Sequence, residues 1–268
     1  MKKIFILIAT FFIGFFSSAF AGEIKFVQVA DPHVTAGNKY SLNVLKAAIE
    51  DINKLDNISF VVFTGDNIDS SKPENHEAFL KIINKLKIPY YIVIGNHDVF
   101  KSNGLSKKEY ISAIKKHNWF YGPSKPNYVF KKGEFVFVVV DGAKETIPGT
   151  GGYYRPATLD WLDKQLTKYR KKKVVIFQHF PLIPPKDAKT HRVYQPENYF
   201  EVLNRHDNVI AIISGHYHVN KEKMENGIYH VSSPCLLTPP NPYKIIDIVT
   251  TKGFSPMIYT QIKEVDYQ

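Results

Sequence analysis

The segment SFVVFTGDNID at residues 59–69 joins a short apolar run to a glycine and two acidic residues. Residues 59–64 are rich in Val and Phe and almost continuously apolar, which is typical of a strand that is covered on both faces. Gly65 follows this run, and Asp66 comes directly after the glycine. We therefore expect a buried strand whose carboxyl end presents a carboxylate.

Apolar runs of the same kind recur at residues 24–30, 90–94, 134–140, 173–178 and 209–213. Between them, apolar residues return at helical spacing in the segments 42–55, 77–86, 107–117, 159–169 and 199–206. This alternation predicts an α/β fold with a largely parallel central sheet. Residues 227–263 are expected to form short strands. Nothing in the sequence indicates a linker or an internal repeat, so we expect one domain over residues 22–268.

Residues of metal-ligand type follow nearly every predicted strand. They lie in the segments Asp31-Pro32-His33, Gly65-Asp66-Asn67, Gly95-Asn96-His97-Asp98, Gln178-His179 and Gly215-His216-Tyr217-His218. In an open α/β sheet, ligands bind beyond the carboxyl ends of the strands, so we expect these segments to converge. Carboxylate, amide and imidazole groups suit divalent Mn, Fe or Zn. Each segment alone is compatible with a turn or a surface histidine, and it is the ordered set that favours a metal site.

The order of these segments resembles that of the calcineurin-like metallophosphoesterase superfamily. The family motifs D-x-H, G-D-x-x-D, G-N-H-D/E, a lone His and G-H-x-H are all intact. Here they read Asp31-x-His33, Gly65-Asp66-Asn67-Ile68-Asp69, Gly95-Asn96-His97-Asp98, His179 and Gly215-His216-Tyr217-His218. The resemblance spans nearly all of the chain after residue 21. It implies a four-layer α/β/β/α sandwich of two mixed sheets flanked by helices.

The resemblance also implies two divalent metal ions, which would be Mn, Fe or Zn. One ion would be held by Asp31, His33, Asp66 and His218. The other would be held by Asp66, Asn96, His179 and His216, so that Asp66 bridges the two. A hydroxide bridging the ions would then hydrolyse a small phosphodiester or phosphomonoester substrate.

Other site residues follow from the same resemblance or from the loops. His97 is expected to protonate the leaving oxygen or to steady the phosphoryl group, and Asp69 to orient the His97 imidazole. Substrate contacts are also expected from Arg155, in the loop at residues 149–155, and from His191, in the segment 184–195. For both loops a solvated surface without substrate contact is the alternative.

Differences between these motifs and those of other subfamilies reduce the number of possible functions. Purple acid phosphatases carry a tyrosine ligand where this chain has Asp69, and Ser/Thr protein phosphatases carry arginine and glycine where it has Ser70 and Ser71. The motif pattern is closest to bacterial enzymes that cleave cyclic nucleotides or other phosphodiesters. Two alternatives remain, namely a catalytically silent metal-binding or scaffold protein on this fold, and a dinuclear hydrolase of another bond such as pyrophosphate.

The first 21 residues have the pattern of a secretory signal peptide. Lys2 and Lys3 precede an apolar stretch at residues 4–16, and small residues end the segment at Ala21. We expect cleavage after Ala21, export to a bacterial periplasm or out of a single-membrane cell, and no stable membrane anchor afterwards. An uncleaved anchor is the alternative, because residues 4–21 together are just long enough to cross a bilayer.

Composition adds weaker constraints. The formal net charge of +10 suits phosphate-bearing ligands but identifies none of them. The longest basic run, residues 170–173, lacks interleaved aromatic residues, so no specific nucleic-acid site is expected. The single Cys235 excludes an internal disulfide and is expected to be a buried, inert thiol. The sequence leaves the oligomeric state open.

Overall fold

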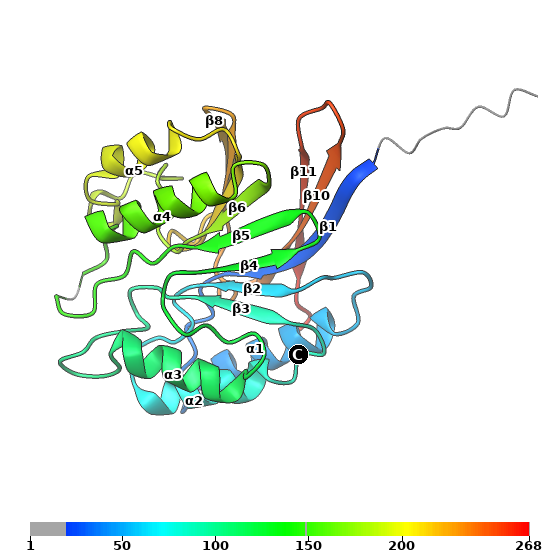
Figure 1. Ribbon diagram of the computed structural model, residues 1–268. Helices are drawn as coiled ribbons and strands as arrows, with labels where there is room; N and C mark the ends of the chain where they lie inside the picture. The colour runs from blue at the N-terminus through cyan, green and yellow to red at the C-terminus, as the bar shows by residue number, and fades with distance from the viewer. Residues whose placement is uncertain (1–19, 148, 268) are drawn as a thin grey trace, which may run out of the picture.

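The computed structural model describes residues 20–147 and 149–267, which form two sheets between two layers of helices (Figure 1). The first sheet has the strand order β11 (Met257–Glu264), β10 (Pro242–Thr251), β1 (Phe20–Val29), β2 (Val61–Thr64) and β3 (Tyr90–Val93). The second has the order β4 (Tyr128–Lys132), β5 (Phe135–Val139), β6 (Lys173–Phe177), β7 (Val209–Ser214), β9 (Ile228–Ser232) and β8 (Lys221–Glu225).

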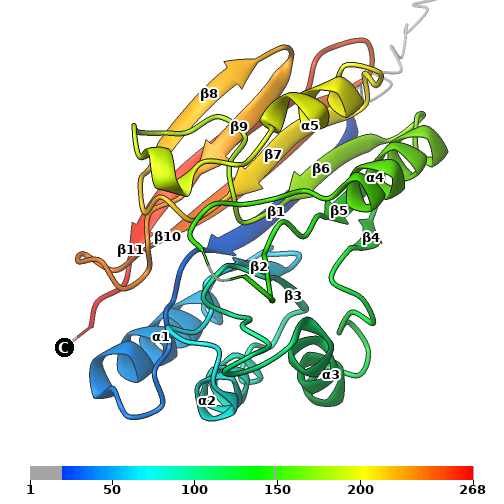
Figure 2. The same ribbon diagram turned by 90° about the vertical axis from the view of Figure 1, so that its left-hand side faces the viewer.

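The helices form the two outer layers, as Figures 1 and 2 show. The first sheet is covered by α1 (Lys39–Ile52), α2 (Pro73–Ile83) and α3 (Lys107–His117). The second is covered by α4 (Pro156–Lys168) and α5 (Pro196–Leu203). Both sheets are mixed: in the first, β1, β2 and β3 are parallel and β10 and β11 add antiparallel pairs on one side, and in the second a parallel centre is flanked by an antiparallel strand at each edge. The expected four-layer α/β/β/α sandwich is therefore confirmed.

Phenylalanine rings fill the space between the two sheets. The rings of Phe26 and Phe60 stack with their centroids 4.8 Å apart. Phe137 of the second sheet meets Phe60 edge-on at 4.9 Å, and all three side chains are fully buried. The opposite faces of both sheets carry a second apolar core under the helices. Strands buried on both faces explain the nearly continuous apolar runs in the sequence.

Element boundaries differ from the predicted ones in a consistent way. Four helices begin three or four residues before the predicted start, at Lys39, Pro73, Pro156 and Pro196. Proline suits the first helical position, but the polar first turn has no apolar periodicity to reveal it. The edge strand β4 was not predicted, because its side chains are only partly buried. The strand β10 is longer than expected, since it pairs along its length with β1 and β11.

The predicted signal peptide lies almost wholly in residues 1–19, outside the described residues. Strand β1 begins at Phe20, and its ladder with β10 runs regularly from Gly22 to Gln28. A chain that starts at Gly22 therefore keeps this ladder, both sheets and both apolar cores, and can fold without the preceding residues. Within the described ranges, the helices are too short or too polar to cross a bilayer.

The inter-sheet core makes a prediction about stability. Because Phe60 is fully buried among other rings, the Phe60→Ala variant should lower the free energy of unfolding by about 3–5 kcal/mol. The same change at Phe120, which is 86% exposed, should alter it by less than about 0.5 kcal/mol. Urea unfolding followed by circular dichroism measures both values. Equal losses in the two variants would contradict the assigned core.

Candidate metal centre

Left-handed backbone gathers at the loops that follow the strands. Nine described non-glycine residues have positive φ angles, and five of these are predicted ligands, namely Asp31 (52°), His33 (39°), Asp66 (48°), His216 (74°) and His218 (56°). Such conformations cost of order 1–3 kcal/mol each and persist only where the surroundings hold them, typically at functional sites. Five strained positions in one region therefore mark the site independently of residue type.

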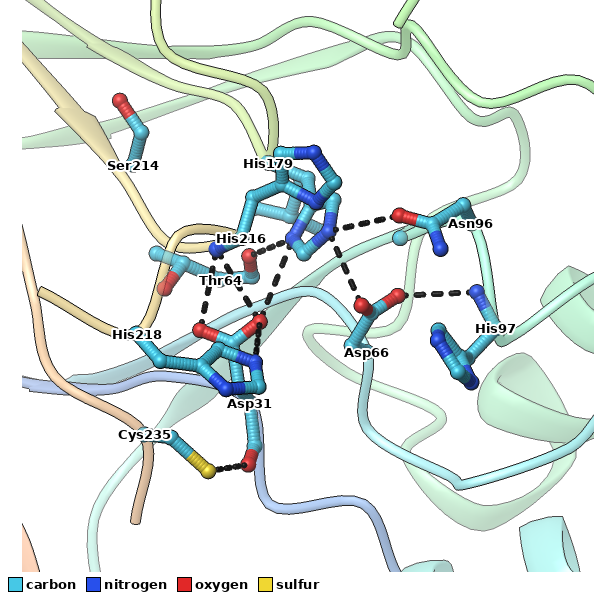
Figure 3. A network of polar contacts seen from close by, with 12 residues as sticks. Asp31, Thr64, Asp66, Asn96, His97, His179, Ser214, His216, His218 and Cys235 are labelled. Atoms are coloured by element: carbon cyan, nitrogen blue, oxygen red, sulfur yellow. Dashed lines mark hydrogen bonds and ion pairs between the residues drawn. The ribbon is translucent and has the colours of Figure 1, made fainter. Parts of the chain in front are cut away.

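Asp66 lies at the centre of this region (Figure 3). Its Oδ2 is 3.2 Å from Nε2 of His179, and its Oδ1 accepts a 2.9 Å hydrogen bond from the backbone N–H of His97. Oδ1 of Asn96 is also 3.2 Å from the same His179 nitrogen. The ligand atoms of Asp66, His179 and His216 lie within 4.8 Å of one another. These side chains thus direct their polar atoms at a shared point.

A second group lies on the other side of Asp66. Nε2 of His33 is 3.2 Å from Nε2 of His218, and the latter is 3.6 Å from Oδ1 of Asp31. The ligand atoms of His33 and Asp66 lie within 4.8 Å of each other, in a group that also includes His97. The structure therefore brings all seven predicted ligands together as two groups that meet at Asp66.

Hydrogen bonds at the far ring nitrogens fix how the imidazoles face. Nδ1 of His179 donates to the carbonyl oxygen of Thr64 at 2.8 Å, which leaves Nε2 for the site. Nε2 of His216 donates to the carbonyl oxygen of His191 at 3.1 Å, which leaves its Nδ1. A backbone carbonyl that orients the far side of the ring is the usual support of a metal-binding histidine.

The electrostatics of the site favour positive charge. Burial alone would raise the pKa of Asp66, but the neighbouring His179 holds it well below its usual range. Burial alone would lower the pKa of His179, but Asp66 raises it to about 9. In contrast, burial and the charge on His179 lower the pKa of His216 to about 2, so this ring is neutral and has a free lone pair.

The residues present fit divalent metal ions. Asp31 and Asp66 are at most 2% exposed, and buried carboxylates need compensating positive charge. The described part of the chain gives the buried Nδ1 atom of His33 no hydrogen-bond partner, and Nε2 of the same ring faces another imidazole nitrogen. Oxygen and imidazole ligands of this kind accept Mn, Fe or Zn.

Asp98 is a residue whose role the sequence did not reveal. Its buried carboxylate accepts hydrogen bonds from the backbone N–H groups of Gly95, Asn67 and Ile68, at 2.8, 2.8 and 3.1 Å. It thereby ties the loop after β2, which carries Asp66, to the loop after β3. Burial and the nearby Asp66 raise the pKa of Asp98 to about 7. The only signal for it was its place at the end of the G-N-H-D motif.

Cys235 also lies beside the predicted ligands. Its Sγ donates to the carbonyl oxygen of Asp31 at 3.0 Å and is within 4.8 Å of ligand atoms of His33 and His218. The thiol is buried, as expected, and burial raises its pKa to about 11. It is therefore a neutral hydrogen-bond donor that supports Asp31 and not a thiolate ligand.

His97 is held by Asp69 through the main chain. Nδ1 of His97 donates to the backbone carbonyl oxygen of Asp69 at 2.6 Å, and the Asp69 residue is exposed. The family motif implied that the carboxylate of Asp69 orients the imidazole. In the structure the contact comes from its carbonyl oxygen.

The two predicted substrate contacts lie differently. His191 is next to the centre, with its ring centroid 5.2 Å from that of His216 and its carbonyl oxygen bonded to that ring. Arg155 precedes helix α4 and is exposed, and within residues 20–147 and 149–267 no polar contact joins its side chain to a candidate ligand.

Gly95 provides a test of this packing. A Cβ at this position would lie 2.2 Å from both the backbone N and Oδ1 of Asp66. The Gly95→Ala variant should therefore displace Asp66 and weaken Mn²⁺ binding about 10–100-fold. Gly37→Ala is the matched control, because a Cβ there meets nothing within 4 Å. Calorimetric titration of the metal-free protein measures both, and an unchanged affinity in Gly95→Ala would contradict the assigned centre.

Comparisons with known proteins agree with this geometry. A sequence profile of the calcineurin-like phosphoesterases matches residues 24–220. A protein of Arcobacter nitrofigilis named as a probable glycerophosphodiester phosphodiesterase is 29% identical over 205 residues, covering 72% of this chain and 71% of that protein. A 3',5'-cyclic-nucleotide phosphodiesterase of a Nostoc species is 23% identical over 220 residues, covering 79% of this chain and 77% of that protein.

A solved structure shows the same fold. The dimetal phosphatase from Danio rerio superposes with a TM-score of 0.66 at 18% identity, covering 91% of this chain and 99% of that chain. The match of the family profile extends over most of the chain and includes every motif that carries a candidate ligand. The expected resemblance to phosphodiesterase-type members is confirmed by the named relatives. The chain therefore belongs to the calcineurin-like phosphoesterase family.

Proposed function

We propose that this protein is an exported phosphodiesterase that uses two divalent metal ions, Mn, Fe or Zn, to hydrolyse a small phosphate ester. Phosphoester hydrolysis follows from membership of the family. The number of ions, the preference for diesters and the export are our proposal.

The two groups of ligand atoms around Asp66 support two ions. One ion would be held by Asp31, His33, Asp66 and His218, and the other by Asp66, Asn96, His179 and His216. When bound, such ions activate water as a nucleophile and neutralise the charge of the phosphoryl group. The protein contributes the fixed directions of the imidazoles, through the carbonyls of Thr64 and His191.

The observation that carries the proposal is the position of His97. Its ring meets the ring of His33 edge-on, with the centroids 4.8 Å apart. Because the Nδ1 proton is bound to the carbonyl of Asp69, Nε2 is the ring nitrogen left to meet a substrate. A protonated Nε2 at the edge of the metal centre can donate to the leaving oxygen as the bond to phosphorus breaks.

The residues that line a cavity beside His97 favour an uncharged leaving group. The cavity has a volume of about 280 Å³, and its walls include Val99, Phe100 and Thr150. The described residues that line it include no lysine or arginine, whereas Asp69 is among them. These walls suit an alcohol better than a leaving group with a further phosphate. This argues for an ester bond over the pyrophosphate alternative.

Different observations support the proposed diester preference and the proposed export. The relatives from Arcobacter and Nostoc are named as phosphodiesterases. Export is supported by the basic, apolar and small-residue pattern of residues 1–21.

The role of His97 can be tested through the leaving group. With Mn²⁺, the chain from Gly22 should hydrolyse bis-p-nitrophenyl phosphate faster than p-nitrophenyl phosphate, and Asp66→Asn should abolish turnover. His97→Ala should lower kcat about 10²–10⁴-fold on a methyl-ester diester, and much less on the p-nitrophenyl diester. The difference arises because p-nitrophenolate leaves without a proton.

His206→Ala is the control for this experiment, because His206 contacts Asp163 on α4. Its kinetics should match those of the unsubstituted protein. If His97→Ala loses the same factor on both diesters, His97 does not act as the general acid. If the metal-loaded protein cleaves neither p-nitrophenyl ester, the proposed function is wrong.

The cavity beside His97 makes a separate prediction about specificity. Removing the Phe100 ring should lower kcat/KM about ten-fold for a diester with an aromatic leaving group, because the leaving group loses apolar contact in the transition state. The methyl-ester diester should be little affected by Phe100→Ala. Steady-state kinetics on the two substrates measure this effect. Equal losses of kcat/KM on both would show that the leaving group does not contact Phe100.

A further inference from the structure

Three consecutive aromatic residues project from the turn between α3 and β4. Trp119, Phe120 and Tyr121, which we call the aromatic turn, are 73%, 86% and 45% exposed. Large aromatic side chains are normally buried, and exposed apolar patches on soluble domains mark binding surfaces. The function proposed above makes no use of this turn, because it packs against the amino end of β3, whereas the candidate ligands follow the carboxyl ends of the strands.

The aromatic turn is surrounded by lysines. Residues 115–132 contain five lysines and no aspartate or glutamate. Nζ of Lys115 donates to the carbonyl of Trp119 and lies 5.7 Å from its ring centroid, and Nζ of Lys132 lies 5.6 Å from the ring centroid of Tyr121. His117, at the end of α3, pairs with Glu77, which also pairs with Lys81. The surface is thus both aromatic and basic.

The aromatic turn lies at the end of the molecule opposite the metal centre. Nδ2 of Asn118 donates to the carbonyl of Tyr90 at 3.4 Å, and the ring of Tyr121 meets that of Tyr91. These tyrosines begin β3, whereas Asn96 follows the carboxyl end of the same strand. The parallel ladder pairs Val27 of β1 with Val61 of β2, and Val61 with Tyr90 of β3, so the amino ends of β2 and β3 lie at this edge and β1 extends beyond it.

Residue 20 lies at the same end. The described chain starts there, in strand β1, and Gly22 packs against the side chain of Glu134 in the turn between β4 and β5. Lys132, the last residue of β4, precedes that turn and contacts the aromatic turn.

We propose that the aromatic turn docks the protein reversibly on an anionic phospholipid bilayer. Trp, Phe and Tyr partition to the interface of a bilayer, and lysines beside them are attracted to anionic headgroups. A cavity of about 290 Å³ between Lys87 and Tyr121 gives a headgroup room to enter. A second copy of this chain is disfavoured as the occupant, because a two-fold contact would place lysines against lysines.

This docking leaves the metal centre facing away from the lipid. A soluble ester can then reach the site while the protein is bound. The docking is weak and reversible, so it differs from a spanning anchor, and it needs none of residues 1–21.

Vesicle sedimentation tests the proposal with the chain from Gly22. It should bind vesicles of phosphatidylcholine and phosphatidylglycerol, bind those of phosphatidylcholine alone much less, and release as the salt concentration rises. The double variant Trp119→Ala/Phe120→Ala should bind the anionic vesicles at least about ten-fold more weakly. Tyr194→Ala is the matched control, because Tyr194 is 64% exposed in a loop outside the aromatic turn.

Fluorescence gives a second measurement that does not depend on enzyme activity. The chain has two tryptophans, and the Trp161→Phe variant leaves Trp119 as the only one. Its emission should shift to shorter wavelength when anionic vesicles are added and stay unchanged with neutral ones. Thermal melting should be the same for the double variant and the unsubstituted protein.

Three results would overturn the proposal. The first is an unsubstituted protein that does not bind anionic vesicles. The second is a double variant that binds them as well as the unsubstituted protein. The third is concentration-dependent dimerisation in analytical ultracentrifugation that the double variant abolishes, which would assign the turn to a second copy of the chain.

Discussion

The buried carboxylate of Asp66 is the constraint around which the site is arranged. Each of its oxygens has a different contact, since Oδ2 faces His179 and Oδ1 accepts from the backbone of His97. At 2% exposure it cannot rely on water, so neighbouring positive charge must stabilise it. The low pKa of Asp66 and the raised pKa of His179 both result from the attraction between the buried carboxylate and the protonated imidazole. A cation-binding site is the consequence of burying such a carboxylate among imidazoles.

The local features that hold Asp66 in place contribute little to the stability of the fold. Asp66 itself has a left-handed backbone, Gly95 leaves no room for a Cβ, and Asp98 fastens the two loops together. The rigid platform for these loops is the apolar sandwich, in which Phe26 and Phe60 fill the space between the sheets. The stability of the core thus offsets the strain at the strand ends.

The sequence predicted most of the strands and the convergence of the candidate ligand residues, because both leave local patterns. It placed α3 at its observed bounds, where Ser106 and Glu109 form a capping box, but missed the first turns that open with proline. The roles of Asp98 and of Cys235 could not be predicted, because each depends on a contact between loops that are distant in the chain. The carbonyl of Asp69 was missed for another reason, since every residue has a carbonyl and only the fold selects one.

Parallel strands give the domain two chemically different ends. Their carboxyl ends carry the acids and imidazoles, since Asp31, Asp66 and Asn96 each follow a parallel strand. Their amino ends carry exposed aromatic rings and lysines, in the turn that follows α3. Because α3 runs back along β3, the loop that leaves the metal centre leads directly to that turn. One helix therefore connects the two ends and fixes their separation, so lipid contact at one end need not obstruct substrate access at the other.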